Sequence, residues 1–248
     1  MPLAELAPYL VLIAVVAALY SSVGHGGASG YIAVLGIAGL SKELLSSTAL
    51  TMNLLVAGIA LYAYAKQGHF RWKIVWPFLL TSIPAAFVGG RFKLEEATYF
   101  IVLAVVLLFA AARLLMPKKQ PSEDTKPISL PLALGAGIAI GLLSGVVGVG
   151  GGIFLSPLLI LLAWAGAKET AAASALFILV NSSAGILGRV STDQFEPVHL
   201  LPLLGAGLIG GIIGATFGAN KLRPVAVQRT LAVVLIIAAV KMAFQYVF

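Results

Sequence analysis

The sequence predicts an all-helical membrane protein that crosses the bilayer several times. Of its 248 residues, 60% are hydrophobic and 10% are charged, and the mean hydropathy is +1.04. A soluble domain carries about 25% charged residues, so this chain has too few to cover a water-facing surface. Residues 6–41 and 127–167 contain no Asp, Glu, Lys or Arg, and a spanning helix needs about 20 apolar residues.

Charged and turn-forming residues divide the chain into ten apolar segments, which we expect to be helical. In the first half they cover 3–22, 28–40, 44–65, 74–90 and 97–116. In the second half they cover 128–147, 152–166, 170–188, 198–218 and 225–247. The segment at 28–40 gives about 20 Å of helix, which is short of the ~30 Å hydrocarbon core. A hairpin that enters the membrane only partly is favoured there, with a fully spanning one as the alternative.

A polar, Pro-bounded stretch at 117–127 predicts a linker between an N-terminal transmembrane repeat of residues 1–116 and a C-terminal one of residues 128–248. Matching motifs support the repeat. Gly24-His25-Gly26-Gly27-Ala28 corresponds to Gly148-Val149-Gly150-Gly151-Gly152, Lys42-Glu43 to Lys168-Glu169, and residues 103–107 to residues 231–235. The offsets drift steadily from 124 to 126 to 128, as small insertions would produce, so we expect a duplication.

The distribution of basic residues predicts that the second repeat is inverted. If each Gly cluster lies between two helices that enter and leave on the same side, one side holds 11 Lys and Arg residues: Lys66, Arg71, Lys73, Arg113, Lys118, Lys119, Lys126, Lys168, Lys221, Arg223 and Arg229. The other side holds five: Lys42, Arg91, Lys93, Arg189 and Lys241. A simple kink at each cluster would give 9 against 7. The positive-inside rule therefore favours hairpins, inverted repeats and outside termini.

The two Gly clusters predict a binding site for an anion. Glycine lets the backbone bend sharply and lets other groups approach it, and a helix that starts after each cluster points unpaired N–H groups into the break. No buried lysine is then needed, which would cost about 2.5–3.5 kcal/mol in a membrane. In inverted repeats the two helix ends meet near the membrane midplane, where transporters bind substrate. The predicted substrate-binding glycines are Gly24, Gly26, Gly27, Gly148, Gly150, Gly151 and Gly152.

Glycines in membrane helices also permit close helix packing, which is the alternative reading of each cluster. Four glycines within residues 148–152 break a helix rather than pack it, which favours the binding site. Close packing is the expected role of glycines that recur along apolar segments, namely Gly135, Gly141, Gly205, Gly210, Gly211 and Gly214.

Polar residues near the clusters are further candidates for substrate contact. Ser22 and Ser29 offer hydroxyl donors, with a bond to their own helix backbone as the alternative. His25 is the one ionisable side chain in either cluster, and it is a candidate for anion contact or proton coupling, with a purely structural role as the alternative. On the following segments we expect Asn53, Ser174 and Asn181 to face the same cavity, with interhelical hydrogen bonding as the alternative.

Composition excludes several other function classes. The chain has no cysteine, which excludes disulfides, thiol chemistry and sulfur-ligated metals, and we expect no metal and no cofactor. The net charge of +7 comes from short loop clusters between apolar runs, a pattern typical of cytoplasmic loops rather than of nucleic-acid binding. The sequence leaves the oligomeric state open.

Two other functions match parts of the sequence. Gly27-Ala28-Ser29-Gly30 fits the Gly-x-Ser-Gly motif of rhomboid-like intramembrane serine proteases. The second half reads Gly151-Gly152-Ile153-Phe154 at this place, with no nucleophile, so we do not expect an enzyme. A passive anion channel is the closer alternative, since paired hairpins also build pores.

The chain resembles the TauE/SafE family of sulfite exporters, also called the toluenesulfonate uptake permease family. The resemblance rests on the two-half layout, on the early Gly-rich turns, and on residues 148–158, 168–176 and 217–222. It implies a multi-pass secondary transporter of the cell inner membrane. The implied substrate is a small sulfur-containing anion such as sulfite or an organosulfonate, which an exporter moves out of the cell. The meeting of the Gly-rich helix ends predicts transport by alternating access, and His25 makes protons the candidate coupling ion.

Overall fold

A computed structural model confirms the all-helical architecture. It describes residues 3–116, 125–196 and 200–220, and the helical residues 232, 233, 235–241, 243 and 244. The helices are α1 (Leu3–Ser21), α2 (Ala28–Ile37), α3 (Lys42–Lys66), α4 (Trp72–Arg91), α5 (Glu96–Leu115), α6 (Leu130–Val147), α7 (Gly152–Leu161), α8 (Ala167–Val190) and α9 (Leu200–Asn220). The described part contains no strand. Most of the predicted linker, and the basic residues Lys118, Lys119, Lys221, Arg223 and Arg229, lie outside the described residues, as does much of the segment predicted at 225–247.

Six of these helices are long and apolar enough to cross a membrane, namely α3, α4, α5, α6, α8 and α9. The chain is therefore a multi-pass membrane protein. By contrast, α2 and α7 have 10 residues each, or about 15 Å of helix, which is about half of the ~30 Å hydrocarbon core. Neither can cross by itself, and this favours the partial hairpin over the fully spanning one.

Both short helices end in the same backbone motif, earlier than the sequence predicted. At the end of α2 the amide of Leu40 donates to the carbonyl of Leu35 (3.4 Å) around Gly39, whose φ is +81°. At the end of α7 the amide of Trp164 donates to the carbonyl of Leu159 (2.9 Å) around Ala163, whose φ is +56°. This is the Schellman arrangement, in which a left-handed residue stops the helix.

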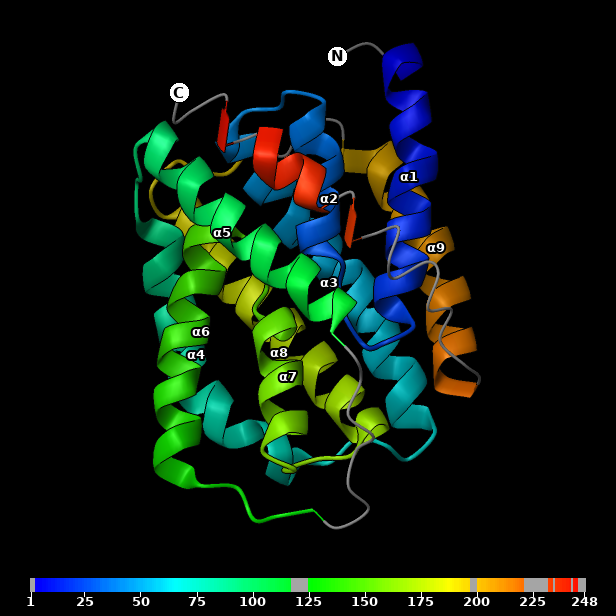
Figure 1. The fold of residues 1–248 in the computed structure, drawn as a ribbon, viewed down its shortest axis with the longest axis vertical. Coiled ribbons are helices and arrows are strands. Elements are labelled where there is room, and N and C mark those ends of the chain that lie inside the picture. The colour runs from blue at the N-terminus through cyan, green and yellow to red at the C-terminus, as the bar shows by residue number, and fades with distance from the viewer. Residues whose placement is uncertain are drawn as a thin grey trace.

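The helices pack in pairs that join the two halves of the sequence. α4 packs mainly against α6 and α8, while α9 packs against α1 and α3. Figure 1 shows α1 and α9 together on one side of the molecule, and α4 and α6 together on the other.

Glycines at every fourth position allow the closest of these contacts. A Cβ added to them would overlap the partner's backbone or its near side-chain atoms, so only glycine permits this approach. On α6 they are Gly137, Gly141 and Gly145, facing α4, and on α9 they are Gly210, Gly214 and Gly218, facing α1 and Ser22. The packing role expected for Gly135 and Gly205 is wrong, because both face open space.

Two main apolar cores follow this exchange of helices rather than the order of the chain. The first core gathers buried residues of α1, α2, α3 and α5, with Leu203 of α9 and Leu235. The second gathers residues of α4, α6, α7 and α8. The second core therefore takes α4 from the first half of the sequence. The first core takes several residues from the second half, namely Val147, Val149, Leu203, Ala232, Leu235, Ala238 and Ala239.

Basic residues that the charge pattern assigns to the same side of the membrane make hydrogen bonds or ion pairs at the same end of the bundle. At one end, Lys42 donates to the carbonyl of Leu94, Gln194 to that of Arg91, and Lys241 to that of Ile37. At the other end, the Arg71 Nε lies 2.6 Å from a carboxylate oxygen of Glu169, and the backbone amide of Lys126 donates to the carbonyl of Ala163.

Candidate functional site

Each Gly cluster forms a sharp break between two helices. Gly27 is the N-cap of α2 with φ +98°, and Gly151 is the N-cap of α7 with φ +80°. A side chain is strained in this left-handed region, which glycine adopts freely. The predicted helix starts after both clusters are therefore confirmed, and the first amides of α2 and α7 point into the breaks without an acceptor in their own helix.

The structure brings the two breaks together beside α3 and α8. A Cβ on Gly26 would meet the side-chain oxygen of Asn53, and a Cβ on Gly150 would meet the side-chain nitrogen of the same residue. Both glycines also face Ile178. The backbones of Gly26 and Gly150, from opposite halves of the chain, therefore lie against the same two side chains. These are Asn53 of α3 and Ile178 of α8.

The first glycine of each break packs on the other half. Gly24 lies against the backbone of Ala171 in α8, and Gly148 lies against Ser46 in α3. The two contacts occupy similar places in the repeat. Ala171 lies three residues after Lys168, and Ser46 lies four residues after Lys42, the residue that corresponds to Lys168. Each break is thus held by a helix of the opposite half.

His25 connects the two breaks through polar contacts. Its Nδ1 lies 3.0 Å from the carbonyl oxygen of Val23, and its Nε2 lies 3.2 Å from that of Gly152. The hydroxyl of Ser156 is 3.1 Å from the same Nε2, and it lies 2.7 Å from the hydroxyl of Ser174. Of the predicted site residues, His25, Gly152 and Ser174 therefore belong to one network.

The asparagines of the predicted site are fully buried, and each retains an unused acceptor. The Asn53 amide donates to the hydroxyl of Ser182 (3.2 Å), joining α3 to α8. The Asn181 amide donates to the carbonyl of Phe177 in its own helix (2.8 Å). Neither side-chain oxygen has a hydrogen-bond partner among the described residues, although a buried acceptor normally has one.

The two serines nearest the first break have other partners. The Ser22 hydroxyl donates to the carbonyl of Leu19 in the preceding turn (2.7 Å), which is the alternative that we considered for it. Ser29 is buried and lies 2.7 Å from the hydroxyl of Tyr20. The hydroxyl that lies 3.1 Å from the His25 ring is that of Ser156, which is outside the Gly-x-Ser-Gly motif.

Sequence analysis missed two residues of this region, Tyr20 and Ser156. Ser156 stands four residues after Gly152, one helical turn along α7, and this spacing would have pointed to it. No local signal distinguishes Tyr20. Ser182, which follows Asn181 directly, is a polar residue of the same segment, and it makes the interhelical hydrogen bond considered as the alternative there. Among the described residues, no cluster of three or more His, Asp or Glu side chains is arranged to hold a metal.

Comparisons with known proteins point to a transporter. Residues 9–242 match the family described as Sulfite exporter TauE/SafE. The chain is 36% identical to the probable membrane transporter protein y4hK of Sinorhizobium fredii, over 92% of this chain and 94% of that protein. It is 25% identical to a probable membrane transporter protein of Haemophilus influenzae, over 76% and 75% of the two chains. It is also 24% identical to the probable membrane transporter protein YunE of Bacillus subtilis, over 75% of each chain. No solved structure has significant similarity to the chain.

Proposed function

The chain belongs to the sulfite exporter TauE/SafE family of membrane transporters, and from this premise we propose that it exports a small sulfur-containing anion, such as sulfite or an organosulfonate, as a secondary transporter of the inner membrane. The substrate site is the place where the two Gly breaks converge beside Asn53. This convergence is the observation that carries the proposal.

The chemistry of the converging breaks suits an anion. The amides of Ala28 and Ser29, at the start of α2, have no acceptor within their helix, and neither have those of Gly152 and Ile153 at the start of α7. A helix N-terminus stabilises a nearby negative charge by about 0.3–1 kcal/mol, and by up to ~2 kcal/mol when partly buried. Two such ends at one site give affinity for an oxyanion without a buried lysine.

The free acceptor oxygens of Asn53 and Asn181 favour a particular class of anion. An unprotonated oxyanion has no hydrogen to give them, whereas hydrogen sulfite carries one. A buried acceptor without a partner costs about 1–3 kcal/mol, so a substrate that donates to it recovers this energy. Within the proposed class, the site therefore binds hydrogen sulfite more tightly than an organosulfonate, which has no proton to donate.

Alternating access is the mechanism that we propose, with the duplicated halves inverted relative to one another. The matching Schellman ends of α2 and α7 support the duplication. So does the packing, because exchanging the halves converts the α4–α6 contact into the α9–α1 contact, and the α4–α8 contact into the α9–α3 contact. The two bundles rock about the breaks and expose the site to each side in turn.

His25 is the residue that we propose for proton coupling. Both of its ring nitrogens face backbone carbonyl oxygens, those of Val23 and Gly152. A neutral imidazole has one N–H and can donate to only one of them, whereas the imidazolium donates to both. Binding and release of a proton would therefore tighten and loosen the link between the first break and α7.

The decisive experiment measures uptake of radiolabelled sulfite by proteoliposomes containing the purified chain, with and without an imposed pH gradient. We expect saturable uptake, counterflow, and competition by sulfoacetate but not by lactate. Flux that neither saturates nor shows counterflow would identify a passive anion channel instead. Absence of flux for every sulfur anion would contradict the proposed substrate class.

A further inference from the structure

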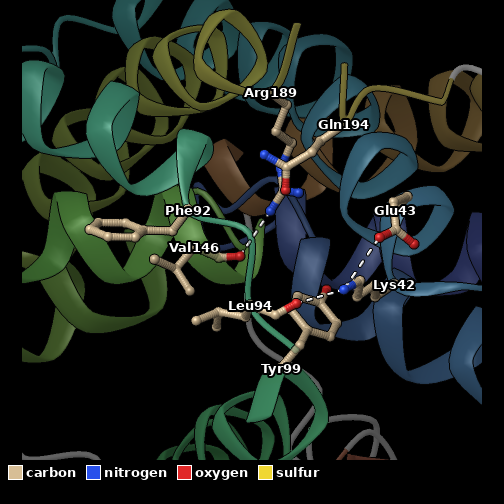
Figure 2. Close-up of a pocket in the computed structure, with 8 residues that line it drawn as sticks. All are labelled: Lys42, Glu43, Phe92, Leu94, Tyr99, Val146, Arg189 and Gln194. Atoms are coloured by element: carbon tan, nitrogen blue, oxygen red, sulfur yellow. Dashed lines mark hydrogen bonds and ion pairs between the residues drawn. The ribbon is translucent and has the colours of Figure 1, made fainter. Parts of the chain in front are cut away.

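A second cationic site lies away from the Gly breaks, at the carboxyl end of α8. Arg189 is only 5% exposed, and it lines a small pocket together with Lys42, Tyr99 and Gln194. Figure 2 shows the guanidinium pointing into the protein toward Val146, with the Lys42 ammonium across the pocket. We refer to this as the Arg189 pocket.

The guanidinium of Arg189 is held by backbone carbonyls rather than by a carboxylate. Its Nη2 donates to the carbonyl oxygens of Gly145 (3.1 Å) and Val146 (2.8 Å). The described ion pairs join Lys42 to Glu43 and Arg71 to Glu169, and neither includes Arg189. Its Nε is buried and has no hydrogen-bond partner within the described part of the chain. A buried charge of this kind is costly, and one of its donors remains unused.

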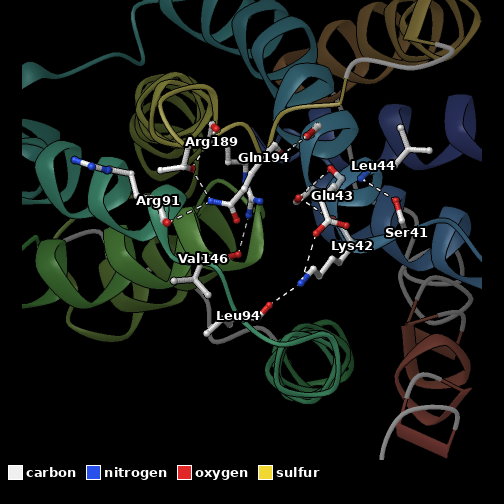
Figure 3. A network of polar contacts seen from close by, with 12 residues as sticks. Ser41, Lys42, Glu43, Leu44, Arg91, Leu94, Val146, Arg189 and Gln194 are labelled. Carbon is white, nitrogen blue, oxygen red and sulfur yellow. Dashed lines mark hydrogen bonds and ion pairs between the residues drawn. The ribbon is translucent and has the colours of Figure 1, made fainter.

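Lys42 supplies a second cation at the same pocket. Its ammonium donates to the carbonyl of Leu94 (2.6 Å) and lies 3.5 Å from a carboxylate oxygen of Glu43. Figure 3 shows this contact in a wider polar network that includes Gln194 and Arg91. Two cations and one carboxylate leave the lining residues with a net charge of +1, so the pocket attracts anions.

The first half of the chain has a neutral group at the matching position. The hydroxyl of Tyr64 donates to the carbonyl of Ser22 (2.8 Å), two residues before Gly24, as Arg189 donates to Val146, two residues before Gly148. The two residues also occupy the same place at the ends of their helices. The backbone amide of His69 donates to the carbonyl of Tyr64 (3.1 Å), and that of Gln194 donates to the carbonyl of Arg189 (2.9 Å).

Arg189 offers more than is needed to donate a hydrogen bond to the last carbonyls of α6. A neutral hydroxyl satisfies the carbonyl at the end of α1, so one donor is sufficient for this task. The arginine adds a full charge that offsets the negative end of the α6 dipole, together with a buried Nε donor. These additions lie at the end of the bundle that carries Lys42 and Arg91.

We propose that the Arg189 pocket is an entry and exit site for the transported oxyanion, bound by the Nε of Arg189 and the ammonium of Lys42. The proposal rests on the proposed function for the identity of the anion. The pocket now has room for about one water molecule, so an oxyanion enters as Lys42 releases Leu94. At the opposite end of the bundle the residue at the matching position is Tyr64, whose hydroxyl carries no charge.

Calorimetric titration of the purified chain with sulfite tests the proposal. We expect two binding events in the wild type, and Arg189→Gln to lose one of them or to weaken it by about tenfold or more, as for a hydrogen bond to a charged group. Gly151→Val should lose the other event. Arg91→Gln, which removes an exposed cation from the same end, is the matched control and should keep both.

Each result of this titration has a distinct meaning. Two events with unchanged affinities in Arg189→Gln would overturn the pocket and leave the central site in place. A single event in the wild type that Arg189→Gln does not alter would do the same. No binding in the wild type would remove the proposed function, and this proposal with it. If Arg189→Gln fails to fold, Lys42→Gln decides, since unchanged affinity of both events in that variant would overturn the pocket.

Discussion

The Nε2 of His25 lies 3.1 Å from the hydroxyl oxygen of Ser156, although the two residues are 131 positions apart and belong to different halves of the chain. The contact is one of a short series, because Ser156 also lies 2.7 Å from the hydroxyl of Ser174 in α8. A change in the protonation or position of the His25 ring therefore acts directly on Ser156 of α7. It acts on Ser174 of α8 through the hydroxyl of Ser156.

Replacement of His25 by glutamine should separate transport from proton coupling. Glutamine retains hydrogen-bonding groups but does not titrate, so saturable sulfite exchange should persist while stimulation by a pH gradient disappears. Uptake into proteoliposomes at several imposed gradients measures both quantities. A variant that responds to the gradient as the wild type does would exclude His25 as the coupling residue.

Gly150→Ala should reduce transport by at least tenfold. Gly150 has φ +74°, and an added Cβ would press on Asn53, Ile178 and Ser182. The left-handed conformation alone costs a non-glycine residue about 1–2 kcal/mol. Gly135→Ala is the matched control, because Gly135 faces open space in α6, and its transport and membrane insertion should equal those of the wild type. Equal flux in both variants would remove Gly150 from the site.

Asn53 and Ser182 should act as a coupled pair in transport. Asn53→Ala removes both the 3.2 Å contact to Ser182 and the unused acceptor oxygen, whereas Ser182→Ala removes the contact alone. We therefore expect a larger loss of sulfite affinity in Asn53→Ala, about tenfold, and little further loss in the double variant. Initial rates at varied sulfite concentration give these affinities. Fully additive losses would show that the two residues act independently.

The absence of cysteine permits a direct test of the inverted topology. Lys93 and Lys168 are both exposed, and the charge pattern places them on opposite sides of the membrane. Lys93→Cys should react with a membrane-impermeant maleimide added from outside, and Lys168→Cys should react only in inside-out vesicles. Labelling of both thiols from one side would contradict the inverted arrangement.

His69 should make the protein less stable in acid. Burial lowers the pKa of His69 from its ordinary 6.5, and the charge of Lys168 lowers it further, against a smaller opposing effect of Glu169. The unfolded chain therefore takes up this proton at a higher pH than the folded one. The stabilisation is complete above pH 6.5 and is lost as the pH falls through the lowered value.

The variant His69→Gln should remove this part of the acid response. Apparent unfolding temperatures at pH 7.5 and pH 5 measure the effect, which should be small because His69 lies in a partly exposed loop. Transport should keep its response to a pH gradient, in contrast to His25→Gln. An unchanged acid response in His69→Gln would show that other groups dominate.

The helices could be predicted from the sequence because apolar runs and charged breaks are local signals. The expected helix starts at Ala28 and Gly152 were right, since a cluster of glycines cannot continue a helix. The ends of α2 and α7 were placed too late, because Leu40 and Trp164 are apolar residues that close Schellman turns rather than extend the helix. Composition alone does not distinguish these two roles.

The candidate site was predictable to the extent that it depends on backbone. Asn53 was predicted to face the cavity, and it does lie against glycines of both breaks. Ser156 and Arg189, which the structure adds as candidates, were missed for a different reason. Their importance arises from partners more than 40 positions away, His25 for Ser156 and Val146 for Arg189, and a single sequence contains no record of such pairings.

The exchange of α4 and α9 between the two cores has a consequence for biogenesis. When α4 leaves the ribosome, its partners α6 and α8 have not yet been made, so its glycine-matched face has only lipid to contact. The first core likewise lacks α9 until the chain is almost complete. Neither core can thus be completed from the first half alone, and the first core is completed last, after α9 has been made. A chain severed within residues 117–124 would yield an active transporter only if both fragments were inserted into the same membrane.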